Sequence, residues 1–335
     1  MKDAKRWAAA LGALLPTPLM ARASGMPVLL PYHHTVSDDY LPHIRGLYAY
    51  KNAGQFEADL DWLLHRYRPL DPAELIKATL EGTPLPPRSF LFSFDDGFRE
   101  IHDVVAPLLV RKGVPALLFI NPAFVDNRAL FYRCKLSLLI EKAKTDRTAA
   151  DAIATYLKLQ GPTIGELRTA LLRIQYPQRA QADELGRLAG IDFDDYLRRQ
   201  QPFMTTSQLQ SLQAQGFYLG GHSIDHPNYR YLTPEEQHRQ TVESVSFVRG
   251  LGAPHHLFAF PHEDLPADQA FFDRLRSEAP YVFFGVRNGL DEARNRLWHR
   301  YNAENPDQSI AAATAAVQLF NALRRATGRR TVQRN

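Results

Sequence analysis

The amino-acid sequence predicts an α/β fold, namely a distorted or incomplete (β/α) barrel with a helical insertion. Short apolar runs alternate with helix-like segments in both halves of the chain. This order is typical of parallel strands that are covered by helices. Between the two halves, residues 130–203 are rich in Ala, Leu, Gln and Arg and contain few strand-like runs. We therefore expect these residues to form the insertion.

The apolar runs and the segments between them define the expected elements of the barrel. Strands are predicted at Pro27–Tyr32, Phe90–Phe94, Pro115–Ile120, Phe217–Gly220, Leu257–Phe260 and Tyr281–Val286. Helices are predicted at Gln55–Tyr67, Val104–Arg111 and Ser207–Gln215, and another opens at Thr233, with Thr233 as N-cap and Glu236 completing a capping box. Outside the insertion and the tails, about 200 residues remain, which is short for a full eight-fold barrel.

Three regions follow from this pattern. Residues 24–305 form the barrel, with the insertion at about 130–203, and residues 306–335 form a C-terminal helix and a basic tail. Residues 1–23 are either an N-terminal helix or a weak signal-like segment, because an apolar stretch at Trp7–Leu15 precedes Ala21-Arg22-Ala23. The helix interpretation predicts a cytoplasmic protein, whereas a signal peptide would predict a periplasmic or secreted one. No apolar stretch reaches the roughly 20 residues of a membrane-spanning helix.

Charge and cysteine content limit the possible partners. The formal net charge is +4. Residues 1–23 contribute +3 and residues 324–335 contribute +5, which leaves −4 for the residues between them. A mildly acidic core argues against a nucleic-acid substrate, while the basic tails are either solvated or in peripheral contact with an anionic membrane. The single cysteine, Cys134, excludes an internal disulfide and a cysteine-based zinc site.

Two carboxylates stand directly after a predicted strand. Asp95 and Asp96 follow the apolar run Phe90–Phe94 and precede Gly97. Adjacent carboxylates after a buried strand are costly unless a cation or a function retains them. Because the two side chains point in different directions, one can bind a metal while the other faces a water molecule. The alternative is an Asp-Asp-Gly turn with both carboxylates solvated.

Two histidines follow another predicted strand. His222 and His226 lie after Gly220 and Gly221, which would let the backbone turn sharply away from the strand. Histidines four residues apart share one face if the loop makes a helical turn, and both could then reach one cation. Taken alone, such a pair is more often structural or exposed on the surface.

Together the two motifs describe a metal site. One carboxylate and two imidazoles form a facial ligand set with open positions, which suits zinc, or else cobalt, nickel or manganese. The remaining carboxylate would then be a general base beside the metal.

This combination resembles the polysaccharide deacetylase family, also called carbohydrate esterase family 4. The resemblance covers roughly residues 25–130 and 204–305 and depends on the stretches SFDDG (93–97), HSIDHP (222–227) and FAFP (258–261). It implies that Asp95 is the catalytic base and that Asp96, His222 and His226 bind a divalent metal. It also implies that the backbone N–H of His262 stabilises the oxyanion.

The sequence departs from the usual family pattern in three places. The third motif lacks the arginine that orients the base, so the residue that orients Asp95 is not identified. The aspartate-tryptophan motif is absent, and the fifth motif is reduced to residues 297–301, where His299 could donate a proton or have a surface or packing role. His262 is the other candidate for the general acid. These departures resemble the branch that acts on exopolysaccharides or cell-surface glycans.

The expected function is metal-dependent hydrolysis of the N-acetyl group of an amino sugar, with release of acetate. A sugar-binding groove needs exposed aromatic side chains, and Tyr32 is the expected substrate contact. Phe98, Tyr229 and Trp298 also lie near the motifs, and the alternative for each of the four residues is packing in the core. The alternatives are a deformylase or deacetylase of a lipid- or nucleotide-linked sugar, and a catalytically inactive carbohydrate-binding member of the family. The insertion is expected to cap the groove.

Overall fold

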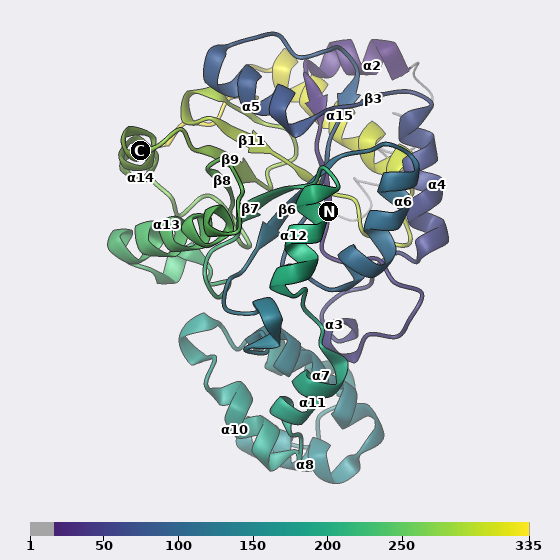
Figure 1. Cartoon of the computed structure of the whole chain (residues 1–335). Helices are drawn as coiled ribbons and strands as arrows, with labels where there is room; N and C mark the ends of the chain where they lie inside the picture. Colours follow the sequence, from purple (N-terminus) through teal and green to yellow (C-terminus); the bar gives the residue numbers. More distant parts are fainter. Residues whose placement is uncertain (1–16, 335) are drawn as a thin grey trace.

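A computed structural model describes residues 17–334, and the stretch Trp7–Leu15 lies outside these residues. The described chain forms a mostly parallel barrel with a helical lobe at one end, which confirms the predicted fold class (Figure 1). Within it, parallel strands follow the order β12-β2-β5-β6-β7-β8-β9-β11. Their bounds are β2 Pro31–His33, β5 Phe92–Phe94, β6 Ala116–Ile120, β7 Tyr218–Gly221, β8 Leu257–Ala259, β9 Val282–Gly285, β11 Leu297–His299 and β12 Tyr301–Asn302.

The last two strands close the barrel. β11 pairs with β9, and β12 pairs with β2 at the start of the sheet. Only Arg300 separates β11 from β12, and its backbone N–H donates to the carbonyl of Gly285. The ring of strands is therefore joined across this one residue. The short β10 (Asp291–Glu292) pairs antiparallel with β11 at the edge.

Two of the predicted strands are each divided between two sheets. The run Pro27–Tyr32 contributes β1 (Val28–Leu29) to a small sheet and β2 to the barrel. The run Phe90–Phe94 is divided in the same way into β4 (Ser89–Phe90) and β5, and β3 (Arg68–Pro69) completes the small sheet. Both runs consist mainly of apolar residues because their four strands are mostly buried.

Helices cover the outside of the barrel. Phe56, Leu60 and Leu63 of α4 are fully buried, as expected from their helical spacing. The helices outside the insertion are α2 Thr17–Ser24, α3 Pro42–Arg45, α4 Ala53–Leu64, α5 Pro72–Glu81, a π-helical turn Ile101–Val105 that continues into α6 Ala106–Arg111, short 3-10 turns at Val125–Asn127, Tyr229–Tyr231 and Ala293–Asn295, α12 Thr206–Ala214, α13 Pro234–Gly250, α14 Gln269–Glu278 and α15 Ile310–Ala326.

The start of α13 matches the sequence prediction only in part. The Thr233 hydroxyl accepts a hydrogen bond from the Glu236 N–H at 3.3 Å, so Thr233 is the N-cap. The Glu236 side chain does not return this bond, because it pairs with Arg239 at 2.9 Å. The capping box is therefore incomplete.

The lobe at the lower end of Figure 1 is helical and has its own hydrophobic core. Phe98 and Phe203 join this core to the barrel, with ring centroids 5.4 Å apart. The lobe consists of α7 Tyr132–Thr145, α8 Arg147–Tyr156, α9 Ile164–Leu172, a 3-10 turn Tyr176–Gln178, α10 Gln181–Leu188 and α11 Phe193–Gln200. We call residues 132–200 the helical lobe.

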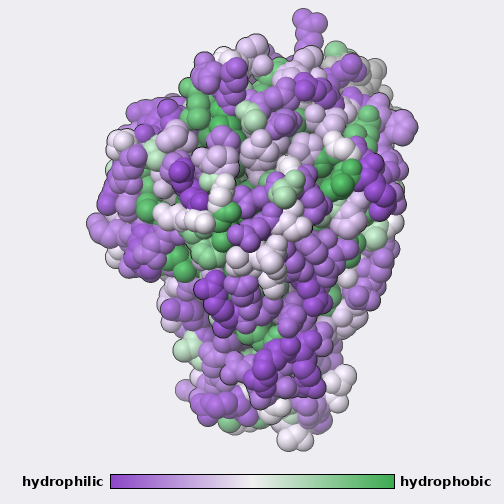
Figure 2. All heavy atoms as spheres, in the orientation of Figure 1, coloured by the Kyte–Doolittle hydropathy of each residue, from purple (hydrophilic) through white to green (hydrophobic). Residues whose placement is uncertain are grey.

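One face of the molecule is seen to be largely hydrophilic (Figure 2). On the face seen in Figure 2, hydrophobic residues form small separate patches over the barrel and the helical lobe. Among the residues that the structure describes, no helix combines the length and apolarity needed to cross a bilayer.

Candidate active site

The motif Asp95-Asp96-Gly97 turns the chain away at the end of β5. Asp96 and Gly97 both adopt left-handed backbone conformations, with φ of 71° and 73°. Asp95 keeps the strand register, and its N–H donates to the carbonyl of His33 at 3.0 Å. This change of conformation between neighbouring residues separates the two side chains, as the sequence suggested. Both carboxylates are nonetheless buried, so the solvated-turn alternative is wrong.

The loop that carries His222 and His226 is not a helical turn, contrary to the sequence prediction. Ser223 and His226 have φ values of 63° and 61°. The Ser223 hydroxyl accepts a hydrogen bond from the His226 N–H at 3.1 Å, and the amide of Asn121 donates to the carbonyls of His222 and Ser223. These bonds bring the two rings together in a tight irregular loop.

The glycines before this loop also have a different role from the one expected. Gly220 and Gly221 belong to β7, and neither has a positive φ. A Cβ at Gly220 would lie 2.7 Å from the Phe119 ring, and one at Gly221 would lie 2.8 Å from the backbone N of Val245. Glycine is therefore required here for close packing between strands and against α13, and not for a turn.

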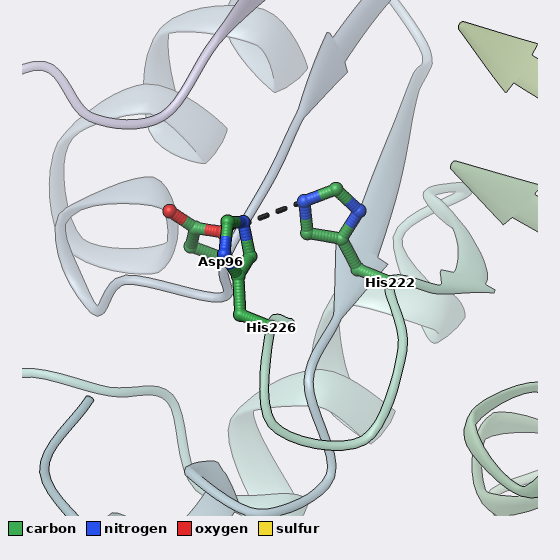
Figure 3. A group of neighbouring side chains, drawn as sticks. All are labelled: Asp96, His222 and His226. Carbon is green, nitrogen blue, oxygen red and sulfur yellow. Dashed lines mark ion pairs between the residues drawn. The ribbon is translucent and has the colours of Figure 1, made fainter. Parts of the chain in front are cut away.

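Asp96, His222 and His226 converge on one point (Figure 3). The Oδ1 atom of Asp96 lies 3.2 Å from Nε2 of His226 and 3.5 Å from Nε2 of His222. Two ligands on a tetrahedral ion with bonds of about 2.0 Å lie about 3.3 Å apart, so these separations suit one cation. Asp96 Oδ1 is buried and accepts no hydrogen bond from the described residues. The donor set therefore fits a divalent metal.

The protonation of His222 also suits coordination. Its Nδ1 lies 2.8 Å from the carbonyl of Ala259, which fixes the proton on Nδ1 and leaves the Nε2 lone pair facing Asp96. Burial lowers the pKa of His222 to about 4, so the ring is neutral at physiological pH. Burial alone would raise the pKa of Asp96, but the neighbouring His226 outweighs burial and holds the pKa below its usual value.

Asp95 is oriented by Arg300. The guanidinium makes a bidentate pair with Asp95, with Nη1–Oδ1 and Nη2–Oδ2 distances of 2.6 and 2.9 Å. Arg300 is fully buried, and its guanidinium lies 4.8 Å from the centroid of the Tyr32 ring. Burial alone would raise the pKa of Asp95, but Arg300 outweighs it, so the pKa is lowered and the carboxylate is ionised. Arg300 thus takes the place of the arginine missing from the third motif.

His34 is a further titratable residue at the site. It lies at the end of β2, and its Nδ1 lies 2.9 Å from the carboxylate of Glu304. Burial alone would lower the pKa of His34, but Glu304 outweighs burial and raises the pKa to about 10. The imidazolium has a second N–H, on Nε2, for which no acceptor exists among the described residues. The motif Tyr32-His33-His34 was visible in the sequence, but without Glu304 it suggested no role for His34.

His262 and Tyr32 both lie at the site, as expected. The His262 ring packs against His226 with centroids 4.5 Å apart, and burial holds the pKa of His262 well below its usual value. The His262 N–H makes no hydrogen bond within the described chain, and its φ of 60° turns the backbone sharply there. This N–H is therefore available to a ligand. Burial raises the pKa of Tyr32 to about 12, so its hydroxyl stays protonated.

His299 does not reach the site. Its ring is buried on the other side of β11, where Nε2 lies 3.0 Å from Glu292. His299 and Arg300 are neighbours in an extended segment, so their side chains point in opposite directions, and it is Arg300 that points toward Asp95. The group Asp264, Glu292 and His299 could also hold a metal by its spacing, but the guanidinium of Arg334 pairs with both carboxylates and already gives each of them a cationic partner.

The site residues surround a cavity of about 340 Å³. Of the four aromatic residues considered from the sequence, Tyr32 and Phe98 line this cavity. Tyr229 is fully buried, and Trp298 donates to the Thr79 hydroxyl in a different region. The lining consists of Tyr32, His34, Leu47, Tyr48, Asp95, Asp96, Phe98, Phe131, Arg133, Leu172, His222, His226, Phe260, His262 and Val286.

Several solved structures share this fold. A deacetylase from Streptococcus pyogenes, PplD, solved with acetate, has a TM-score of 0.56 at 13% identity, over 87% of this chain and 97% of its own. IcaB from Ammonifex degensii has a TM-score of 0.52 at 16% identity, over 87% of this chain and 97% of its own. A de-N-acetylase from Aggregatibacter actinomycetemcomitans has a TM-score of 0.54 at 13% identity, over 86% of this chain and 99% of its own. At such identities the likeness concerns the fold alone.

The family is shown by the sequence itself. No curated protein matches the chain significantly. The family model described as polysaccharide deacetylase matches residues 82–270, which is more than half of the chain. The matched region includes Asp95, Asp96, His222 and His226. The protein therefore belongs to the polysaccharide deacetylase family, a group of hydrolases that act on the carbon–nitrogen bond of N-acetyl groups.

Proposed function

We propose that this protein removes the N-acetyl group from an amino sugar of a polysaccharide or glycan precursor, in a metal-dependent hydrolysis that releases acetate. The observation that carries the proposal is the convergence of three functions on one cavity. Asp95 is an oriented carboxylate that can act as a base, Asp96, His222 and His226 are spaced to hold one cation, and His34 is paired with Glu304 and can donate a proton.

The cation is proposed to be zinc, with cobalt, nickel or manganese as alternatives. Two imidazoles and one carboxylate are the ligand types that these ions accept, with positions left for water and substrate. When bound, the ion supplies Lewis acidity toward the amide carbonyl and the attacking water. His222 and His226 are held by their loop, and His222 is fixed further by the carbonyl of Ala259.

The residues of the chain move the protons. Asp95 removes a proton from water as the water oxygen attacks the acetamide carbon. The backbone N–H of His262 donates to the oxyanion that develops on the former carbonyl. His34 then gives its Nε2 proton to the sugar nitrogen as the carbon–nitrogen bond breaks, and Glu304 stabilises the imidazolium until that step. The products are acetate and a free amino sugar.

The substrate is proposed to be an exopolysaccharide or a cell-surface glycan. Supporting this, the chain departs from the usual family pattern at the motifs in which the branch that acts on such glycans also departs, and a protein that shares its fold is described as a de-N-acetylase. The acetate in the Streptococcus pyogenes structure is the expected product of such a reaction. An inactive carbohydrate-binding role is less consistent with the site, because sugar binding alone would not need a buried base and a proton donor beside the cation site.

Acetate release from a panel of acetylated glycans and sugar nucleotides tests this proposal. We expect release with at least one glycan, its loss after treatment with a chelator, and its recovery with zinc or cobalt. Asp95→Asn is the matched control, because it removes the base while keeping side-chain volume and the cation site. Undiminished release by this variant, or no release by the wild type from any glycan, would contradict the proposal.

A further inference from the structure

The helical lobe forms one wall of the active-site cavity. Arg133, near the start of α7, and Leu172, at the end of α9, line the cavity together with the metal-site residues. Nη1 of Arg133 donates to the carbonyl of Leu172 at 3.3 Å, which fixes the guanidinium at this wall. An arginine therefore faces the space that the substrate must occupy.

The charge of Arg133 is not balanced inside the cavity. Asp95 is paired with Arg300, and His34 is paired with Glu304. Asp96 faces His222 and His226. Arg133 has no carboxylate within ion-pair distance in the part of the chain that the structure describes. A partly buried guanidinium without an acid partner favours a ligand that brings a negative charge.

Three more residues extend this feature outward along the lobe. The Arg133 guanidinium lies 5.5 Å from the centroid of the Tyr132 ring, and the Tyr132 and Tyr176 rings are 6.3 Å apart. Arg179 stacks over Tyr176 at 4.0 Å and is exposed, again without a carboxylate partner among the described residues. We call Tyr132, Arg133, Tyr176 and Arg179 the arginine–tyrosine track.

The track is fixed to the loop that carries the metal ligands. The Tyr176 hydroxyl donates to Oδ2 of Asp225 at 2.6 Å, and Asp225 lies between His222 and His226 in sequence. Gln240 of α13 donates to the other oxygen of Asp225 at 2.8 Å. The track and the metal ligands therefore keep a fixed relative position, so a glycan held by one is placed at the other.

We infer that the arginine–tyrosine track selects an acidic glycan, in which a carboxylate or phosphate lies close to the acetamido sugar. This inference rests on the proposed function and names its substrate class. Guanidinium groups pair with anionic oxygens through two parallel hydrogen bonds. The partly exposed ring of Tyr176 presents amphipathic surface for a sugar ring, whereas Tyr132 is buried and packs against Tyr176. A track that served only neutral sugar hydroxyls would not need two arginines that both lack acid partners.

Binding to the Asp95→Asn variant, loaded with zinc, tests the inference by calorimetry without turnover. The probes are a tetrasaccharide of alternating N-acetylglucosamine and glucuronate, and the neutral tetramer of N-acetylglucosamine. A second comparison, of the affinities for N-acetylglucosamine 6-phosphate and for N-acetylglucosamine, tests whether a phosphate can supply the negative charge. We expect at least roughly ten-fold tighter binding of one acidic probe than of its neutral counterpart at low salt, with the difference reduced at high salt.

Variants then assign the effect to the track. Arg133→Gln should remove most of the preference for the acidic probe, and Arg179→Gln part of it, while affinity for the neutral probe is kept. Lys158→Gln is the matched control, because Lys158 is an exposed cation of the same lobe, outside the cavity lining. Circular dichroism and thermal melting of each variant check that it folds.

Two outcomes would overturn the inference while leaving the proposed function intact. One is equal binding of the acidic and neutral probes, or no binding of either, by a protein whose wild type releases acetate. The other is an equal loss of affinity for both probes in Arg133→Gln, which would mean a neutral contact or a structural role. Failure of the proposed function is recognised separately, since the wild type would then release no acetate from any glycan.

Discussion

Arg300 holds both carboxylate oxygens of Asp95 from the junction at which the barrel closes, at distances of 2.6 and 2.9 Å. Both side chains are buried, and no other described residue pairs with Asp95 in this bidentate way. The orientation of the proposed base therefore depends on one guanidinium, which is also the largest of the influences that lower the pKa of Asp95.

Replacing Arg300 should affect orientation and charge separately. Arg300→Lys keeps the charge but loses the bidentate geometry, so kcat should fall by about 10²-fold, as expected for a misplaced catalytic group. Arg300→Gln also removes the charge that lowers the pKa of Asp95, so the acid limb of the kcat/KM profile should move to higher pH. The measurement is the pH profile of acetate release. If kcat and the acid limb of the pH profile were unchanged in both variants, Arg300 would be excluded as the residue that orients and ionises Asp95.

His34 and Glu304 should control the alkaline limb of the pH profile of acetate release. Because Glu304 raises the pKa of His34 to about 10, the imidazolium persists to alkaline pH and is lost as the pH rises through this value. Glu304→Gln should lower that pKa and move the alkaline limb to lower pH. His34→Gln should reduce kcat by about 10²–10⁴-fold through loss of the proton donor. An alkaline limb that stays in place in Glu304→Gln would exclude His34 as the acid.

Metal content should depend on three side chains and not on their neighbour. Asp96→Ala and His222→Ala should each lose bound metal, because each removes one of three protein ligands. Asp95→Asn should keep one full equivalent, since Asp95 lies 3.9 Å from His222 and is committed to Arg300. Elemental analysis of the purified variants measures this. A full equivalent in His222→Ala would remove His222 from the ligand set.

Arg334 should stabilise the fold without taking part in catalysis. It pairs with Asp264 and Glu292 in a buried cluster, so Arg334→Ala should cost about 3–5 kcal/mol of unfolding free energy by leaving buried carboxylates uncompensated. Thermal melting measures the loss, and kcat at a temperature well below the melting transition should be unchanged. A melting temperature equal to that of the wild type would contradict this.

The cluster of Arg334, Asp264 and Glu292 also predicts that the melting temperature depends on pH in the acidic range. Burial alone would raise the pKa of Glu292, but His299 and Arg334 outweigh burial and lower it to about 2. A depressed pKa stabilises the folded state above the ordinary carboxyl value of about 4.5, and this stabilisation is lost as the pH falls toward 2. Melting temperatures of the wild type should therefore fall over this range, and those of Arg334→Ala should fall less. A parallel fall in both proteins would count against this assignment.

The sequence predicted the barrel and the metal triad because both depend on local patterns. Apolar runs identified the strands. Asp96 and His222 stand within two residues of a strand end, and His226 lies in the loop that follows His222, where parallel strands bring their loops together. Arg300 and Glu304 could not be assigned, because their partners lie 205 and 270 residues away in sequence. His299 and Arg300 are neighbours whose side chains face opposite sides of the strand, so only one of them can reach the site. The resemblance to the fifth motif favoured His299, whereas the structure places Arg300 there.

The irregular loop around His226 could not be predicted for a different reason. A four-residue spacing is compatible with a helical turn, but Ser223 and His226 both take left-handed conformations that L-residues adopt rarely. Their cost is offset by hydrogen bonds from Asn121, which is remote in sequence. The spacing thus identified the correct ligands through an incorrect local geometry.

The position of Arg300 between β11 and β12 links assembly of the molecule to its chemistry. A folding intermediate in which every barrel strand except β12 had paired would already have His222, His226 and Asp96 in place, and could bind a cation. It would nevertheless have no hydrolase activity, because no guanidinium would align Asp95. Recovery of activity during refolding should therefore lag behind metal uptake, and the length of this delay would measure how long the last strand takes to pair with the sheet.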